Sequence, residues 1–156
     1  MRRARTRGVV TLAKGLLDPT KPARPAAAKA HQLLADLFLA GVAAQFFLAG
    51  LAVFRAKSHG NQRFADSSTF DPHRALGNVL ILVAVLIVLA AVLAARQVVQ
   101  SAALLALMIL QSVWTAIGGG APALAALHVL GGMVIAVLAY SMHGAGRRRV
   151  RELSER

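Results

Sequence analysis

The sequence predicts an all-α fold in which four transmembrane helices run up, down, up and down as one bundle. Hydrophobic residues make up 57% of the 156 residues, and they gather in four long runs. Most of the charged residues lie between or outside these runs. A pattern of Gln, Gly and His occurs once in each half of the chain. The four runs are therefore predicted to form two similar hairpins of a polytopic membrane protein.

Each apolar run is long enough to cross a membrane. Residues 75–95 contain a single polar side chain, that of Asn78. At about 1.5 Å per residue, such a run spans a hydrocarbon core about 30 Å thick. A soluble domain of this size has no room to bury four such segments. The predicted spans are residues 32–54, 74–95, 97–117 and 123–142.

The segments between the predicted spans set the order of the helices. Asp71 and Pro72 are typical of a helix start, with Asp as the cap and Pro at the first helical position. Arg96 marks a tight turn, and Pro122 follows a run of glycines and begins the last helix. Short connections at two of the three turns favour antiparallel neighbours. The predicted parts are a basic arm at 1–30, a four-helix transmembrane domain at 31–143 and a basic tail at 144–156.

Lysine and arginine are distributed unevenly between the two sides of the membrane. Of the 18 such residues, fourteen lie before the first span, at the turn between spans two and three, or after the last span, and four lie on the opposite side. The positive-inside rule therefore predicts that both termini are cytoplasmic, where the basic ends would contact anionic headgroups of the lipid bilayer. The scarcity of aromatic residues and the lack of a binding motif argue against a nucleic-acid partner. Because the chain has no cysteine, disulfides and thiolate metal sites are excluded.

One motif occurs in both halves of the chain. A glutamine lies late in one predicted helix, and a His-x-x-x-Gly sequence lies early in the next. In an up-down-up-down bundle, the second and fourth helices run in the same direction and face each other diagonally. Both histidines are then predicted at the external end of the bundle. The first copy contains Gln45, Gly50, His73 and Gly77, and the second contains Gln111, Gly118, His128 and Gly132.

Two histidines on facing helices are suited to hold a b-type haem, because each imidazole offers a ring nitrogen to one axial position of the iron. The glycine four residues after each histidine lies on the same helix face and leaves room for a flat macrocycle. Each glutamine would bond a propionate or the second nitrogen of a ligand histidine, and Arg74 would neutralise a propionate. The predicted site consists of the metal ligands His73 and His128, with Gly77, Gly132, Gln45, Gln111 and Arg74 around the haem.

Two other functions use the same polar residues. His73 lies in the first turn of its predicted helix and His128 about six residues into its own, a difference in depth of about 9 Å. A shared metal would therefore require that the second helix begins earlier or that the helices tilt. In a haem-free structural or accessory subunit of a membrane complex, the histidines and glutamines would bond across helices. In a small-solute or proton carrier, they would form a polar path with Asp36. His31 and His143 are predicted at headgroup level on the cytoplasmic side.

Parts of the sequence resemble known families. Residues 44–54 and 70–77 resemble a family of small bacterial four-span membrane proteins of unassigned function, and Gln111 and His128 also match its pattern. The same arrangement is similar to one half of haem A synthase, whose halves are four-helix bundles. This resemblance implies that His73 and His128 are haem ligands on the external side. It also implies a location in the bacterial cytoplasmic (inner) membrane.

The chain departs from haem A synthase in two respects. It holds one four-helix unit where the synthase has two, so a homodimer would be needed to rebuild an eight-helix arrangement. Both glutamates, Glu152 and Glu155, lie in the tail, so a catalytic acid of the synthase type has no counterpart. The sequence therefore favours haem binding for electron transfer or haem handling over an enzyme activity.

Overall fold

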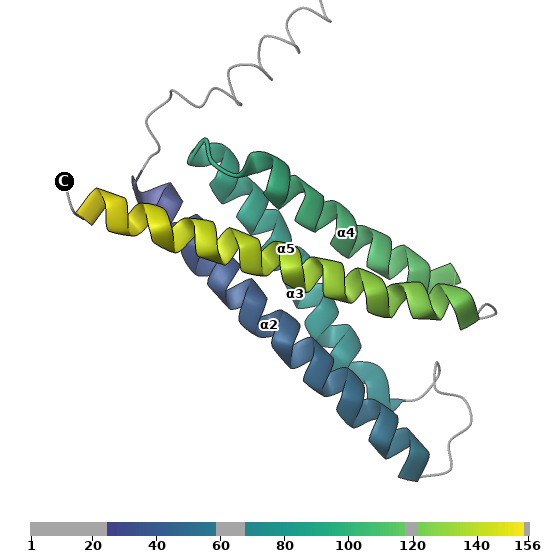
Figure 1. The fold of residues 1–156 in the computed structure, drawn as a ribbon. Helices are drawn as coiled ribbons and strands as arrows, with labels where there is room; N and C mark the ends of the chain where they lie inside the picture. Colours follow the sequence, from purple (N-terminus) through teal and green to yellow (C-terminus); the bar gives the residue numbers. More distant parts are fainter. Residues whose placement is uncertain (1–24, 59–67, 118–121, 155–156) are drawn as a thin grey trace, which may run out of the picture.

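The computed structural model describes residues 25–58, 68–117 and 122–154, and these form a bundle of long helices (Figure 1). All four helices are long and apolar enough to cross a membrane, and no strand occurs in these three segments. The predicted all-α, multi-pass architecture is therefore confirmed. The elements are α2 (Pro25–Ser58), the 3-10 turn η2 (Ser68–Phe70), α3 (Asp71–Leu93), α4 (Val98–Ile117) and α5 (Pro122–Ser154).

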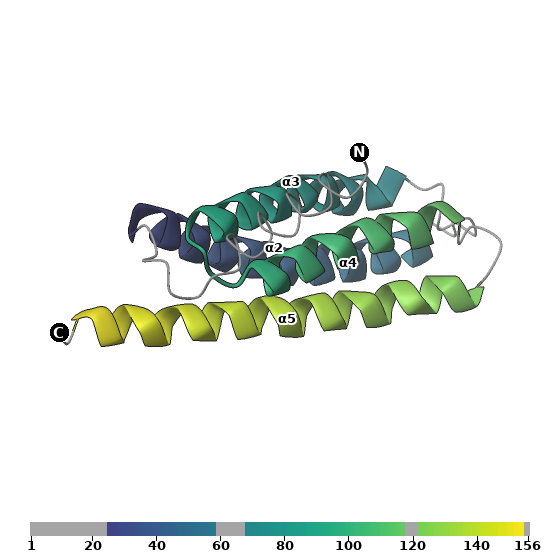
Figure 2. The same ribbon diagram turned by 90° about the horizontal axis from the view of Figure 1, so that it is seen from above.

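Each helix packs against two neighbours. α2 contacts α3 and α5, and α4 contacts the same two helices from the other side, as Figures 1 and 2 show. The helices therefore pair diagonally as α2 with α4 and as α3 with α5, which confirms the predicted arrangement of the second and fourth spans. We call the end of the bundle that holds the start of α2 and the end of α5 the proximal end. The opposite end, where α3 begins and α4 ends, is the distal end.

The start of α3 differs from the prediction. The cap is Phe70, which makes no side-chain hydrogen bond to the helix, while Asp71 is the first helical residue and Pro72 the second. The prediction that Asp71 is the cap was therefore wrong by one position. The Asp71 carboxylate instead accepts a hydrogen bond from the Arg74 guanidinium at 2.9 Å. A negative charge in the first turn still compensates the positive end of the helix dipole.

Two helices continue beyond the predicted apolar spans. α2 begins at Pro25, and its first residues are mostly alanine, which has the highest helix propensity. α5 contains 33 residues, a length of about 50 Å at 1.5 Å per residue. Both therefore exceed the thickness of a hydrocarbon core, and both extend at the proximal end.

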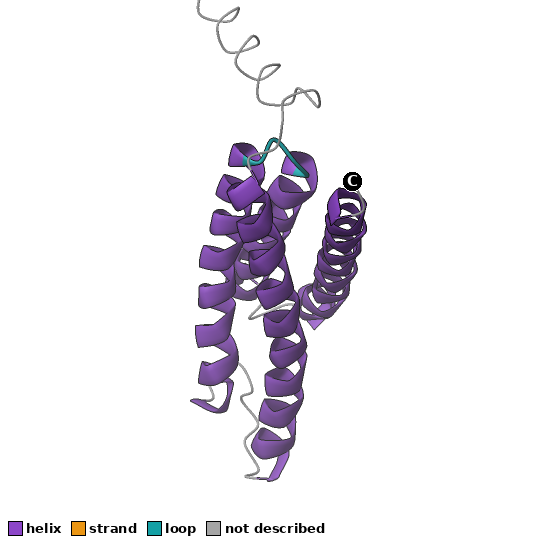
Figure 3. Cartoon of the chain, turned by 90° about the vertical axis from the view of Figure 1, so that its left-hand side faces the viewer, coloured by secondary structure: helices purple, strands orange, loops and turns teal. Residues whose placement is uncertain are grey.

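A tight turn joins α3 to α4. Ala95 and Gln97 both have φ of 50°, in the left-handed region that L-residues rarely adopt. Arg96 is the residue between these two, and its guanidinium donates a hydrogen bond to the carbonyl of Ala145 on α5 at 3.1 Å. Figure 3 shows this turn in teal as the loop of the described chain. The turn predicted at Arg96 is thus present, and its side chain ties it to α5.

An apolar core fills the middle of the bundle. Leu80 on α3 packs so closely on α2 that a Cβ atom added at Gly41 would lie 2.5 Å from a Leu80 methyl carbon. The absence of a side chain at Gly41 therefore allows the close approach of the two helices. The outward faces carry large apolar side chains, as a lipid-facing surface requires. The core consists of Phe38, Val42, Leu80, Val83, Ala84, Ile87, Leu104, Met108, Ile135, Ala139 and Met142.

Candidate functional site

The distal end brings the two motif histidines together. His73 is the third residue of α3 and His128 the seventh of α5. Their ring centroids lie 6.1 Å apart, with an angle of 73° between the ring planes. The two histidines lie at different distances from the starts of their helices. This difference does not keep the two rings apart. The two histidines therefore form one pair across the α3–α5 diagonal.

A carbonyl group on α2 fixes the orientation of the His73 ring. The Nδ1 atom of His73 lies 3.2 Å from the backbone oxygen of Gln45. Because a carbonyl only accepts hydrogen bonds, Nδ1 must carry the hydrogen in this contact. In a neutral imidazole, the lone pair is then on Nε2. This arrangement of one nitrogen donating to a carbonyl and the other available is the usual state of a metal-ligating histidine.

His128 is held through its backbone instead of its ring. The side-chain amide of Gln111 on α4 donates a hydrogen bond to the His128 carbonyl at 2.9 Å. The Nδ1 atom of His128 is buried and has no hydrogen-bond partner, and the same is true of Oε1 of Gln111 and Oε1 of Gln45. Buried polar atoms without partners are costly and rare in folded proteins. Three such atoms lie next to the histidine pair, where a ligand or a water molecule can form hydrogen bonds with them.

The glycines of the motif receive the glutamines of the neighbouring helices. A Cβ atom added at Gly77 would lie 3.0 Å from the amide nitrogen of Gln45. One added at Gly131 would lie 2.9 Å from the amide nitrogen of Gln111. The glutamine of each hairpin therefore packs on a glycine of the next helix. Gly132 is the predicted motif glycine, but its neighbour Gly131 lies closer to the Gln111 amide.

A side chain at Gly132 would have more space than one at Gly131. A Cβ atom there would meet the ring of Phe46 at 3.6 Å and the amide of Gln111 at 3.7 Å, which are ordinary contact distances. Both motif glycines thus lie against protein side chains. The sequence predicts that the glycines leave room for a macrocycle, whereas the structure packs the glutamine side chains against them.

Arg74 lies on the surface of the distal end. Its guanidinium forms an ion pair with Asp71 one turn earlier, and both side chains are largely exposed. An exposed pair of this kind contributes little to stability. The positive charge that was predicted to neutralise a propionate is therefore present at this end, but it is balanced by a carboxylate.

The distance between the two rings can be compared with that of two imidazoles bound to one metal. With metal–nitrogen bonds of about 2 Å, two imidazoles on opposite sides of one metal have their centroids about 6 Å apart, close to the 6.1 Å found. Among the described residues, no group of three or more His, Cys, Asp or Glu side chains is positioned to bind a metal. A bare ion would thus have two protein ligands, whereas a haem supplies four more.

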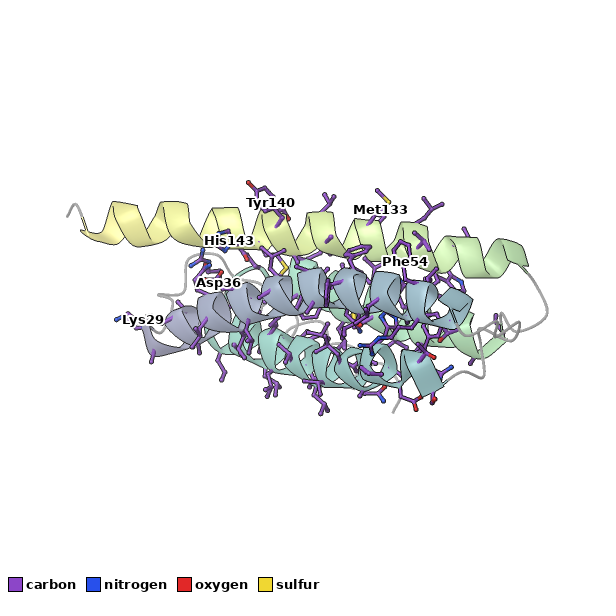
Figure 4. The ribbon with its side chains drawn as sticks, turned by 90° about the horizontal axis from the view of Figure 1, so that it is seen from below. Lys29, Asp36, Phe54, Met133, Tyr140 and His143 are labelled. Atoms are coloured by element: carbon purple, nitrogen blue, oxygen red, sulfur yellow. The ribbon has the colours of Figure 1, made fainter. Side chains whose placement is uncertain are left out.

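The proximal end holds a second set of polar contacts, which the sequence did not pair. The ring of His31 on α2 lies 3.1 Å from the hydroxyl of Ser101 on α4, and both residues are almost fully buried. Asp36 on α2 contacts His143 on α5, with Oδ1 and Nδ1 2.5 Å apart. Figure 4 shows Asp36 and His143 facing each other between the two helices. His31 was expected at headgroup level but instead ties the α2–α4 diagonal inside the bundle.

These features define a class of protein: a multi-pass membrane protein whose four-helix bundle carries a polar site at each end. Residues 45–117 match a family described as "Family of unknown function (DUF6220)". The matched region is just under half of the chain and runs from Gln45 to the end of α4, so it includes His73 and Gln111 but not His128. No curated protein and no solved structure matches the chain.

Proposed function

We propose that the protein binds one b-type haem between His73 and His128. The observation that carries this proposal is the pairing of the two imidazoles across the α3–α5 diagonal, with centroids 6.1 Å apart. Bound in this way, the haem would supply reversible one-electron chemistry. The protein would serve electron transfer or haem handling in a bacterial cytoplasmic membrane, with both termini in the cytoplasm.

The surrounding residues support this assignment. The hydrogen bond from His73 to the Gln45 carbonyl directs the second ring nitrogen of His73 to a ligand. Next to the pair, the side-chain oxygens of Gln45 and Gln111 lack hydrogen-bond partners among the described residues. Ionisable side chains inside membrane-spanning helices are uncommon and usually functional. His73 and His128 would bind the iron, and the glutamines would bond polar groups at the edge of the haem.

Absorption spectroscopy of the purified full-length protein tests the proposal. The protein would be produced in cells supplied with haem, and its reduced-minus-oxidised spectrum recorded in detergent. We expect a b-type haem band that is lost in His73→Ala and in His128→Ala but kept in His143→Gln, which changes a histidine at the opposite end. Circular dichroism must show that the variants remain helical. A colourless protein from which no haem can be extracted would contradict the proposal.

A second candidate function follows from the packing of the glycines. Because glutamine side chains already cover Gly77 and Gly131, the same residues would serve as interhelical ties in a haem-free accessory subunit. In that case, the purified protein is colourless, and His73→Ala weakens the bundle without any spectroscopic change. The melting temperature and the spectrum of one variant therefore separate the two functions.

A carrier function is less well supported. The polar residues of the distal and proximal ends would have to form a continuous path through the membrane. Between them lies the apolar core, which includes the fully buried side chains of Phe38, Ile87 and Leu104. A proton or polar solute would lose its hydrogen bonds in this region. A proteoliposome flux that Asp36→Asn abolishes would favour this function over the other two.

A further inference from the structure

The contact between Asp36 and His143 is part of a small network at the proximal end. Oδ1 of Asp36 lies 2.5 Å from Nδ1 of His143, and the same oxygen accepts a hydrogen bond from the side-chain amide of Gln32 at 2.8 Å. The Gln32 amide also reaches the backbone oxygen of His143 at 3.5 Å. Gln32 therefore holds the carboxylate in place on α2 and directs it toward α5.

The pair lies in an apolar part of the chain. Asp36 belongs to a helix region with the hydropathy of a membrane span, and so does His143. On α2, the neighbouring Leu33 and Leu37 are exposed as lipid-facing residues are. The ring of Tyr140 stacks beside the His143 ring, with centroids 6.4 Å apart, and Figure 4 shows Tyr140 projecting away from the bundle. A net charge in such surroundings is costly.

The number of protons on the pair decides its net charge. With a neutral imidazole and an ionised carboxylate, the pair carries one negative charge. When one proton binds to the imidazole, the pair becomes a neutral ion pair joined by a charge-assisted hydrogen bond.

The two side chains remain accessible from outside the bundle. The exposed fractions are 21% for the His143 side chain and 36% for that of Asp36, whereas His31 at the same end is 2% exposed and bonded to Ser101. The Asp36–His143 pair is therefore open at the surface of the bundle. The buried His31 has no comparable access.

Among the described residues at this end, Lys29 and Arg96 are cations, whose positive charges oppose the binding of a proton. Lys29 is one helical turn or more from Asp36 on α2, and Arg96 donates to the carbonyl of Ala145, two residues after His143. The charge of Arg96 acts on His31, while the Tyr140 ring stacks on His143. Gln32, the remaining polar contact of the pair, does not titrate.

From these observations, we propose that Asp36 and His143 form a proton-binding site that exchanges one proton with the aqueous phase at the proximal end. Because Nδ1 of the neutral imidazole already donates its hydrogen to the carboxylate, the added proton binds at Nε2 of His143. Proton binding strengthens the connection of α2 to α5 by converting a hydrogen bond into an ion pair. The site is separate from the histidine pair at the distal end and does not depend on a bound haem.

Infrared difference spectroscopy tests the proposal. The full-length protein would be placed in lipid nanodiscs, and spectra recorded at about pH 8 and about pH 5, the range in which an imidazole titrates. We expect imidazole bands that are lost in His143→Gln, together with a shift of a carboxylate band that is lost in Asp36→Asn. The matched control is Ser141→Ala, because the Ser141 hydroxyl is exposed and bonds the carbonyl of Leu138 in its own helix. This control should give the wild-type difference spectrum.

The result separates a proton-binding site from a purely structural contact. If the contact only ties α2 to α5, Asp36→Asn and His143→Gln lower the melting temperature but leave the pH difference spectrum as in the wild type. That outcome would overturn the proposal. If one variant fails to fold, the other still decides the question, because each side chain contributes its own bands. Reduced-minus-oxidised spectra of both variants should be unchanged from those of the wild type.

Discussion

The two ends of the bundle are built in different ways from similar residues. At the distal end, each hairpin contributes one histidine and one glutamine, although His73 is bonded through its ring and His128 through its backbone. At the proximal end, the contacts are asymmetric, and they join His31 to Ser101 and Asp36 to His143. The duplicated motif therefore shapes one end of the molecule, and residues that occur once shape the other.

The two ends also differ in how well their polar groups are satisfied. Three buried polar atoms of Gln45, Gln111 and His128 at the distal end have no partner. At the proximal end, the imidazoles of His31 and His143 both contact a polar side chain, while Gln97 in the turn keeps one unpartnered oxygen. Among the described residues, the distal end thus keeps unsatisfied polar atoms, whereas the proximal polar groups largely satisfy one another.

The largest effect on stability is expected at the distal end, where Gly131→Ala would disturb the close packing of α4 on α5. The added methyl would lie 2.8 Å from the ring of Trp114 and 2.9 Å from the Gln111 amide. Overpacking of this kind should lower the free energy of unfolding by about 3 kcal/mol. Equilibrium unfolding in mixed micelles, followed by circular dichroism, measures this change.

The matched control for Gly131→Ala is Gly50→Ala on α2. No atom lies within 4 Å of a Cβ added at Gly50, so this variant should be neutral or stabilised by up to about 1 kcal/mol through helix propensity. Equal effects of the two substitutions would show that the glycine at 131 is not required for the contact with Gln111.

A smaller loss is expected at the proximal end from Ser101→Ala. This change removes the hydroxyl partner of His31, which is buried, and leaving a buried polar group unsatisfied costs about 2 kcal/mol. The control is Ser112→Ala on the same helix, whose hydroxyl bonds the carbonyl of Met108 four residues earlier. A loss no greater than that of the control would mean that the His31–Ser101 contact does not stabilise the α2–α4 diagonal.

The smallest effect is a gain in stability from Ala95→Gly in the turn between α3 and α4. Ala95 has a φ of 50°, and a left-handed conformation costs an L-residue about 1–2 kcal/mol. Because glycine loses more backbone entropy on folding, by about 0.5–1 kcal/mol, the net gain should be about 0.5 kcal/mol. Ala94→Gly, at a φ of −82°, should instead be slightly destabilising in the same unfolding measurement.

Helix number, order and diagonal pairing could be predicted because they depend on apolar run length and connection length. The exact helix ends could not be predicted in this way, because they depend on local helix propensity. For example, α2 starts at Pro25, which alanines follow, well before the apolar run. At the start of α3, the cap is Phe70 and not the predicted Asp71.

The distal site was partly predictable for a different reason. His73 and His128 repeat in matched positions, and repetition in the sequence reports on symmetry in space. The pairs His31–Ser101 and Asp36–His143 have no such signal, because they join helices whose relative rotation is set by packing. The contact of Gly131 with Trp114 likewise depends on a register between α4 and α5 that no single segment encodes.

The two diagonal contacts lie at opposite ends of the bundle, and this has a consequence for axial sliding. His31–Ser101 connects α2 to α4 near one membrane face, and His73–His128 connects α3 to α5 near the other. A shift of any one helix along its axis would therefore disturb one of these two contacts. Together they oppose axial sliding of all four helices, in addition to the packing of the apolar core.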